Sequence, residues 1–225
     1  MIKITDTEVF GWGAAIRGMR APMNSWDKSD SYWTHIEDAE TKQTAKFEFF
    51  LGENDLKLMR SLAKAGDDHG KCLRMIHVQA DITAPLYWWK EYDTYKVGTV
   101  ANSCSTMHKI HSKPIELLDF SLDDFAINRD IDYRLEDMLY NITADCELLR
   151  RKYLETQDKR YWKALIQLLP QSYNQKRTID LNYQVLVHMY FARRNHKLSE
   201  WHEFCDWVED LPYFKEIVVQ EEKEG

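Results

Sequence analysis

The chain has 225 residues, of which 44% are hydrophobic, and its formal net charge at pH 7 is −7. This length allows one good-sized core, and because no glycine, serine or proline-rich linker divides the chain, we expect one domain over residues 1–225. The negative charge argues against binding of long nucleic acids, which demands a basic face. No run approaches the ~18 apolar residues that span a bilayer, and the N-terminus lacks the order of a secretion signal, so a soluble protein is expected.

Cysteine usage indicates a reducing compartment. The four cysteines lie far apart and include no C-x-x-C pair, so neither a zinc site nor a disulfide scaffold is predicted. The histidines between residues 69 and 111 fit no metal-ligand spacing, and no metal is predicted. We therefore expect a cytoplasmic protein.

The first half of the chain mixes strands and helices. Residues 2–10 and 46–51 are expected to be extended, and residues 11–31 to form an irregular connection or short helix. Asn54 is predicted to cap a helix that Gly66 ends, because apolar residues recur at helical spacing between them. A strand or kink is expected before Pro85. The run EDAETKQTAK and the C-terminal EEKEG are predicted to be solvated.

The second half is mainly helical. Apolar periodicity predicts helices over residues 133–153, 161–169 with Pro170 as the terminator, 179–191 and 198–208. Strands concentrated in the first half and helices in the second define a helix-rich α+β fold with a small antiparallel or mixed sheet.

The segment from Pro85 to Pro114 (PLYWWKEYDTYKVGTVANSCSTMHKIHSKP) is the most informative. Large aromatics are followed by small polar side chains where an ordinary core element would carry Leu, Ile and Val. Buried donors and acceptors are costly unless each finds a partner, so a bound polar ligand is the economical interpretation.

Two segments together resemble the flavin-dependent thymidylate synthases. That family carries a proline, aromatics, an R-H-R triplet, and a small-polar stretch that ends in a serine two residues before an arginine-tyrosine pair. The corresponding residues here are Pro85, Tyr87, Trp88, Trp89, Thr94-Tyr95-Lys96, Asn102, Ser103, Ser105 and Met107-His108. In the second segment, the family has a leucine-proline, a tyrosine, an asparagine that opens a helix, a histidine or asparagine inside it, an arginine near its end, and a tryptophan. The corresponding residues are Leu169-Pro170, Tyr173, Asn182, His188, Arg193 and Trp201. The resemblance covers roughly residues 66–207.

The resemblance implies a homotetramer that binds FAD between subunits. It implies transfer of a methylene group from methylenetetrahydrofolate to C5 of a uridine nucleotide, dUMP or a related one, with NADPH as reductant. Ser105 takes the catalytic position, as a substrate contact rather than a nucleophile. Substrate-binding positions fall on Lys176, Gln184 and His108. Cofactor-binding positions fall on Arg74, Tyr95, Lys96, Asn102, Ser103, His188, Arg193 and Asn195.

Several positions depart from the family pattern. Thr94-Tyr95-Lys96 replaces the R-H-R triplet, Met107-His108 replaces the arginine-tyrosine pair, and Gln184 replaces an arginine. Lysine is a point-charge substitute for the bidentate guanidinium. A family member that binds nucleotide or flavin without making thymidylate therefore stays open as an alternative, as does a purely helical interaction protein.

Each candidate residue also has a possible structural role that involves no ligand. Ser105 could be a helix cap or a buried hydroxyl, and Lys96, Lys176 or Arg193 a solvated surface charge. His188 lies among apolar residues, so a hydrogen-bonded core histidine is its default role. The aromatics Tyr87, Trp88, Trp89 and Tyr92 could stack on a flat ring or pack in a helix interface.

Overall fold

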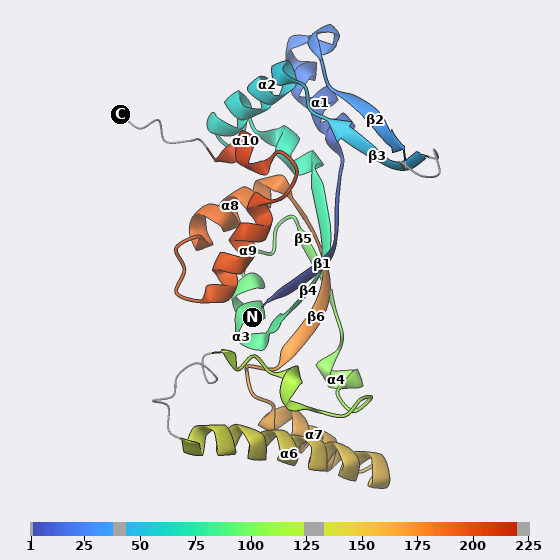
Figure 1. Cartoon of the computed structure of the whole chain (residues 1–225), viewed down its shortest axis with the longest axis vertical. Coiled ribbons are helices and arrows are strands. Elements are labelled where there is room, and N and C mark those ends of the chain that lie inside the picture. Colours follow the sequence, from blue (N-terminus) through green and yellow to red (C-terminus); the bar gives the residue numbers. More distant parts are fainter. Residues whose placement is uncertain (1, 38–43, 124–132, 220–225) are drawn as a thin grey trace. The chain divides into compact units, whose positions relative to one another are not determined.

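The computed structural model describes residues 2–37, 44–123 and 133–219, with only the backbone described at 36–37, 44–47 and 133–136 (Figure 1). One sheet has the strand order β1-β4-β6-β5, and a second pairs β2 with β3 antiparallel, Trp33 opposite Phe49. The strands are β1 (Lys3–Phe10), β2 (Tyr32–Glu37), β3 (Thr44–Phe50), β4 (His77–Pro85), β5 (Thr99–Ser103) and β6 (Asn174–Asn182).

Helices dominate the remainder of the described chain. The α-helices are α1 (Trp12–Arg20), α2 (Glu53–Lys64), α3 (Leu86–Tyr92), α4 (Thr106–Lys109), α6 (Tyr133–Thr156), α7 (Lys159–Leu168), α8 (Tyr183–Arg193), α9 (Ser199–Glu209) and α10 (Phe214–Val218). Short 3-10 helices are η1 (Ala21–Met23), η2 (Trp26–Lys28), η3 (Lys71–Met75) and η4 (Leu117–Asp119). The expected helix-rich α+β class is confirmed. Within the described ranges, no helix combines the length and apolar character that crossing a bilayer requires.

Local sequence signals account for many of these elements. Strand β4 alternates buried Val78, Ala80, Ile82 and Ala84 with more exposed polar residues, the period-2 pattern of a half-buried strand. Pro85 ends β4 and stands at the N-cap of α3, and α7 stops at Leu168, two residues before Pro170. Asn182 opens α8 as the resemblance implied, because its side chain accepts a hydrogen bond from the Val185 N–H at 3.1 Å.

Two expected boundaries were wrong. Asn54 does not cap α2; it lies inside the helix, and its N–H and that of Asp55 donate instead to the carboxylate of Asp30, 24 and 25 residues earlier. Residues 179–182, expected in a helix, belong to β6, because Ile179 and Leu181 continue the buried alternation of that strand. The side chains of EDAETKQTAK and of the EEKEG tail, both expected to be solvated, lie outside the described residues.

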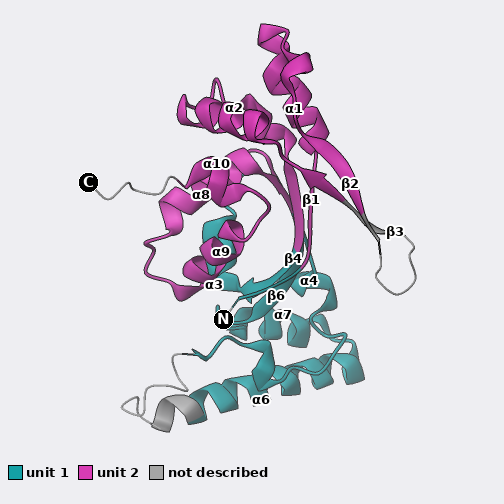
Figure 2. Ribbon diagram, turned by 45° about the horizontal axis from the view of Figure 1, so that its top comes forward, with its two compact units in different colours: residues 1–5, 81–96, 101–179 teal, residues 6–80, 97–100, 180–225 magenta. Residues whose placement is uncertain are grey.

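The chain divides into two compact units (Figure 2). One comprises residues 1–5, 81–96 and 101–179, and the other residues 6–80, 97–100 and 180–225. Each unit collects three separate stretches, so no single linker in the sequence divides them. In the first unit, α6 packs on α7 over a core of Ile110, Ile115, Phe120, Cys146, Leu165 and Tyr173. In the second, α10 packs on α2 and α9, and α8 contacts η3.

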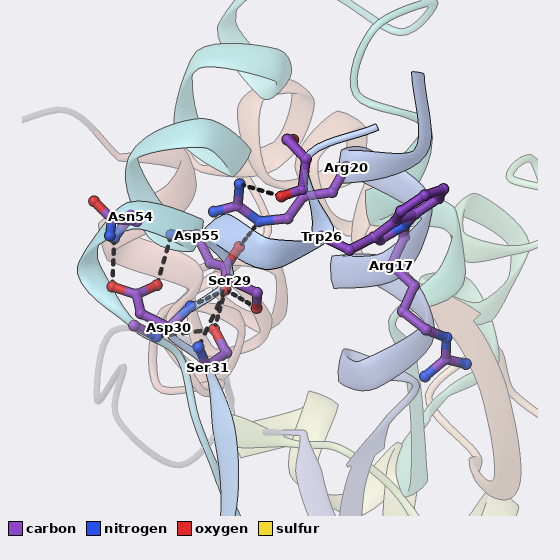
Figure 3. A network of polar contacts seen from close by, with 10 residues as sticks. Arg17, Arg20, Trp26, Ser29, Asp30, Ser31, Asn54 and Asp55 are labelled. Atoms are coloured by element: carbon purple, nitrogen blue, oxygen red, sulfur yellow. Dashed lines mark hydrogen bonds and ion pairs between the residues drawn. The ribbon is translucent and has the colours of Figure 1, made fainter. Parts of the chain in front are cut away.

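Arg20 and Asp55 form a buried ion pair in the second unit (Figure 3). Asp55, with 0% of its surface exposed, accepts from Arg20 Nε at 2.5 Å and from the hydroxyls of Ser29 and Ser31 at 2.7 Å each. Burial alone would raise the Asp55 pKa, but the hydrogen bonds from both serines and Arg20 outweigh it and lower that pKa. The segment between α1 and β2 is thereby tied to α2.

Candidate functional site

Asp67, in the turn after α2, collects three of the side chains that the sequence singles out. Its carboxylate oxygen Oδ1 accepts from Gln184 Nε2 at 2.9 Å and lies 3.2 Å from His188 Nε2. Its carbonyl oxygen accepts from Arg74 Nη2 at 3.4 Å. Gln184 and His188 are one turn apart on α8, which is why both reach the same carboxylate.

These groups border a cavity of about 500 Å³, which we call the α8 cavity. One part of its lining is basic, from Arg60, Lys64 and Arg194, and Asp67, Gln184 and His188 add polar atoms. The apolar part comes from residues such as Leu73, Val187, Phe191, Ile217 and Val218. A mixed lining of this kind suits a ligand with both a flat apolar ring and anionic groups.

His188 is not the core histidine that its sequence context suggests. Its side chain is 51% exposed, because α8 turns this position away from the buried Leu186 and Met189 and toward Asp67. Gln184, in contrast, is buried, and its Oε1 has no hydrogen-bond partner among the described residues. Since Nε2 donates to Asp67, the amide orientation is fixed and Oε1 is the acceptor left over.

Ser105 and Lys176 line a second cavity, of about 330 Å³, in the other unit. Ser105 is the N-cap of α4 and accepts from the His108 N–H at 3.1 Å, so the helix-cap role is confirmed. Lys176 Nζ lies 2.7 Å from Asp81 Oδ2. The hydrogen bond from Lys176, with a second from Thr178, lowers the Asp81 pKa. Part of the lysine charge is therefore already balanced.

The remaining candidates lie at the surface of their units. Lys96, Asn102, Ser103, His108 and Asn195 are exposed, and Tyr95 is half-buried. Arg193 places its guanidinium over the Trp201 ring, 4.9 Å from the centroid. Its neighbour Arg194, which sequence reasoning did not select, is the arginine that lines the α8 cavity.

The burial argument for the Pro85–Pro114 segment was wrong. Its aromatics Trp88, Trp89 and Tyr92 are buried and contact one another, whereas the polar residues Asp93, Thr94, Lys96, Asn102, Ser103 and His108 are exposed. Helix α3 turns the aromatics inward, and the polar residues follow on the turn and on β5. The packing interpretation of the tryptophans is the one observed.

Sequence patterns did not select five charged residues that the structure brings to notice: Arg60, Lys64, Asp67, Arg177 and Arg194. Arg177 lies 4.2 Å from the Trp89 ring centroid and donates from Nη1 to Asp93 Oδ1 at 2.7 Å. A lone charged residue on a strand or helix gives no sequence signal that separates it from a solvated one. The one sequence signal near these residues is Gly66, which precedes Asp67. Its φ of +100° permits the turn in which Asp67 lies.

No family model matches the chain, and no curated protein matches it. Among solved structures, its fold is similar to that of flavin-dependent thymidylate synthases. One crystal structure from Helicobacter pylori, of the synthase complexed with FAD and dUMP, has a TM-score of 0.65 at 14% identity and covers 97% of this chain and 98% of its own. A second, of Thymidylate Synthase X from the same organism with FAD and dUMP, has a TM-score of 0.66 at 14% identity and covers 98% of each chain. Likeness at this identity establishes the fold.

Proposed function

We propose that this protein binds FAD and a uridine nucleotide, dUMP or a related one, and reductively methylates the base at C5. Methylenetetrahydrofolate would donate the carbon and NADPH the reducing equivalents. The observation that carries the proposal is the likeness of fold over 97% of this chain to a protein crystallised with FAD and dUMP. A fold by itself does not fix a function, so the proposal also depends on the side chains of this chain.

The residues of the α8 cavity fit a flavin dinucleotide. Arg60, Lys64 and Arg194 supply positive charge for a diphosphate, and the apolar lining supplies contact area for a ring. Gln184 lines the same cavity but keeps its nucleotide role, because its Oε1 lacks a donor that an N–H of the base would provide. Bound FAD would supply the redox chemistry that reductive methylation needs, and the protein would position the reactants.

We assign the cofactor-facing roles to Arg74 and His188, with Asp67 as the residue that orients His188. A carboxylate at 3.2 Å from Nε2 fixes the imidazole ring, and a ring held by one nitrogen presents the other at a defined place. Tyr95, Lys96, Asn102, Ser103, Arg193 and Asn195 are further cofactor contacts under this proposal. Their surface positions suit a site completed by another subunit of a homotetramer.

The nucleotide roles go to Ser105, Lys176, Gln184 and His108. Ser105 Oγ already accepts from a backbone N–H, so its hydroxyl hydrogen remains to be donated to a base carbonyl. Lys176 would contact phosphate as a point charge, in competition with Asp81 at 2.7 Å. The protein would work in the cytoplasm, where the nucleotide and folate pools lie.

Two observations favour a second function. Met107 and His108 stand where the family pattern has arginine and tyrosine, and Asp81 balances part of the Lys176 charge. A phosphate site without a guanidinium group loses the bidentate grip on a dianion and depends on lysine point charges, of which Lys176 is already paired. The second candidate is therefore a protein that binds flavin or nucleotide without synthesising thymidylate.

Two measurements test the proposal. The absorbance spectrum of the purified protein, with mass spectrometry of the small molecules it releases, should show oxidised flavin. Tritium release from C5-labelled dUMP in the presence of the folate and NADPH should then require the protein. Flavin without tritium release would favour the second candidate, and protein that neither contains nor takes up FAD would refute both.

A matched pair of variants locates the site. His188→Ala should weaken FAD binding, whereas His202→Ala should not, because His202 is an exposed histidine of α9 that donates to the His196 carbonyl and lies outside the α8 cavity. Equal FAD dissociation constants for the two variants would remove His188 from the site.

A further inference from the structure

A third cavity, of about 770 Å³, lies in the unit that contains α1, the β2–β3 hairpin and α10. Five aromatic residues from separate stretches of chain line it: Trp12, Trp33, Phe49, Trp207 and Tyr213. None of them belongs to the residues assigned to flavin or nucleotide above. We call it the aromatic cavity.

Four of the five rings contact one another and form a connected wall. Trp12 stacks on Phe49 with centroids 5.8 Å apart and an interplanar angle of 9°, and Phe49 meets Trp33 edge to face at 5.1 Å. Tyr213 meets Trp12 edge to face at 5.5 Å. Trp12 and Phe49 are buried and hold the wall from behind, whereas Trp33 is 55% exposed. The accessible ring faces are thus fixed by a packed second layer.

Tyr213 has a strained backbone conformation. Its φ of 58° lies in the left-handed region, which a residue with a large side chain adopts only when its surroundings demand it. Its hydroxyl donates to the Phe49 carbonyl and accepts from the Leu51 N–H, both at 3.2 Å. Trp207 is likewise pinned, since its Nε1 donates to Thr7 Oγ1 at 3.1 Å. Strain of this kind often accompanies a ligand site.

All the charged side chains that line the aromatic cavity are acidic. Glu8, Glu48, Asp210 and Glu216 line it, and none of the described lining residues is Lys, Arg or His. Glu8, Glu48 and Glu216 form no ion pair with a described residue, and Asp210 lies 4.0 Å from Lys215 Nζ. Like charges around one cavity repel each other and favour a cation between them.

We propose that the aromatic cavity binds a small organic cation of the quaternary alkylammonium class. Such a cation has no N–H to satisfy and a methyl surface that packs on ring faces, where the ring quadrupole attracts its charge. The carboxylates add long-range attraction without needing direct hydrogen bonds. A metal ion is a poor match, because aromatic rings offer it no oxygen ligand, and among the described residues no group of His, Cys, Asp and Glu is placed to hold one.

Choline and its neutral isostere 3,3-dimethylbutan-1-ol test the proposal on the full-length protein. Dissociation constants would be measured by saturation-transfer NMR on the methyl protons, at equal ionic strength. We expect saturable choline binding at millimolar or lower concentration and binding of the isostere that is weaker by about fivefold or more. Equal affinity for the two compounds, or no saturable choline binding, would overturn the proposal.

Matched variants locate the site. Trp33→Ala should weaken choline binding by about fivefold or more, whereas Trp26→Ala should leave it unchanged. Trp26 is a tryptophan of similar exposure, 50%, that does not line the cavity. Both rings lie at the surface, so both variants should fold, and unchanged melting temperatures would confirm this. Choline affinity that is unaffected by Trp33→Ala would place the cation elsewhere and refute the assignment.

Charge is tested separately with Glu48→Gln, against Glu155→Gln as the control. Glu155 is an exposed carboxylate of α6 that pairs with Lys152 and lies outside the cavity. Choline affinity should fall in the first variant only. An equal response in both would show that the net charge of the protein, and not the cavity, attracts the cation. Addition of FAD should leave choline affinity unchanged, since the inference is independent of the proposed function.

Discussion

Gln184 donates from Nε2 to Asp67 Oδ1 at 2.9 Å, which joins the first turn of α8 to the turn after α2. The two residues are 117 positions apart in the chain. His188, one turn further along α8, shares the same oxygen atom. A single carboxylate therefore sets the position of two side chains that line the α8 cavity.

Removal of this carboxylate should affect ligand binding more than stability. We expect Asp67→Asn to weaken FAD binding by roughly tenfold, because hydrogen bonds to a charged acceptor are lost, while the free energy of unfolding changes by less than ~1 kcal/mol since the group is half-exposed. Flavin fluorescence titration and thermal melting would measure the two effects. Asp68→Asn is the control, because Asp68 is exposed and does not line the α8 cavity. An unchanged FAD dissociation constant for Asp67→Asn would contradict the proposed arrangement.

The Arg20–Asp55 pair should be essential for stability. Asp55→Ala should lower the free energy of unfolding by about 3–5 kcal/mol, because it leaves the guanidinium of Arg20, a residue that is 4% exposed, without its counter-charge. Guanidinium-induced unfolding would measure the loss. Asp27→Ala, a change at an exposed aspartate of η2, should cost less than ~0.5 kcal/mol. Similar losses for both variants would show that the buried network contributes little.

Stability should depend on pH through Glu147. The hydrogen bond from Arg150 lowers the Glu147 pKa from 4.5 to about 2, with help from the Ile115 N–H and Arg151. A folded-state pKa below the unfolded one means that the contribution is fully present above about pH 4.5 and is lost as the pH falls through about 2. The shift corresponds to at most roughly 3–4 kcal/mol.

Glu147→Gln should remove this dependence. The variant should be less stable than the parent at neutral pH, and the difference should vanish toward pH 2, as followed by urea unfolding across the acid range. Glu155→Gln provides the comparison, since an exposed pair with Lys152 contributes ~0–1 kcal/mol at any pH. A constant difference between parent and Glu147→Gln from neutral to acid pH would contradict the assignment.

Cysteine reactivity should be confined to one position. Cys72, Cys146 and Cys205 are buried, and burial is the main cause that raises the pKa of each thiol to about 11. Few of these thiols ionise at neutral pH, and reagents reach them poorly. Ellman's reagent should therefore label Cys104 quickly in the folded protein and all four cysteines after unfolding. Fast labelling that persists in Cys104→Ser would show that another thiol is accessible.

The Trp89 ring should contribute to stability and not to ligand stacking. Its Nε1 donates to the Gln175 carbonyl at 2.9 Å, and both groups are buried. Trp89→Phe should lower the free energy of unfolding by ~1–3 kcal/mol, because the carbonyl loses its donor. FAD affinity should stay the same in a direct titration. Loss of flavin binding without loss of stability would restore the stacking role.

Residue patterns along the chain predicted most elements but not their spatial neighbours. Helices α6 and α7 followed from apolar spacing and Pro170, which are local properties, and the strand or kink expected before Pro85 is the strand β4. The capping of α2 could not be predicted, since Asp30 provides it from 24 residues away. The polar run after Trp89 was expected to be buried but is exposed. Sequence spacing could not predict this, because it does not say which side of a turn faces solvent.

For the candidate site, the sequence by itself determined which residue types occupy the family-like positions, from Arg74 and Ser105 to Gln184 and His188. It also determined the helix-rich α+β class, because periodicity and helix-stop signals are written into neighbouring residues. Only the tertiary structure decided that Asp67 joins Arg74, Gln184 and His188, that Asp81 balances Lys176, and that an acidic, aromatic cavity lies beside the β2–β3 hairpin. These relations depend on contacts between residues far apart in the chain, and contact between distant residues is set by packing and not by local preference.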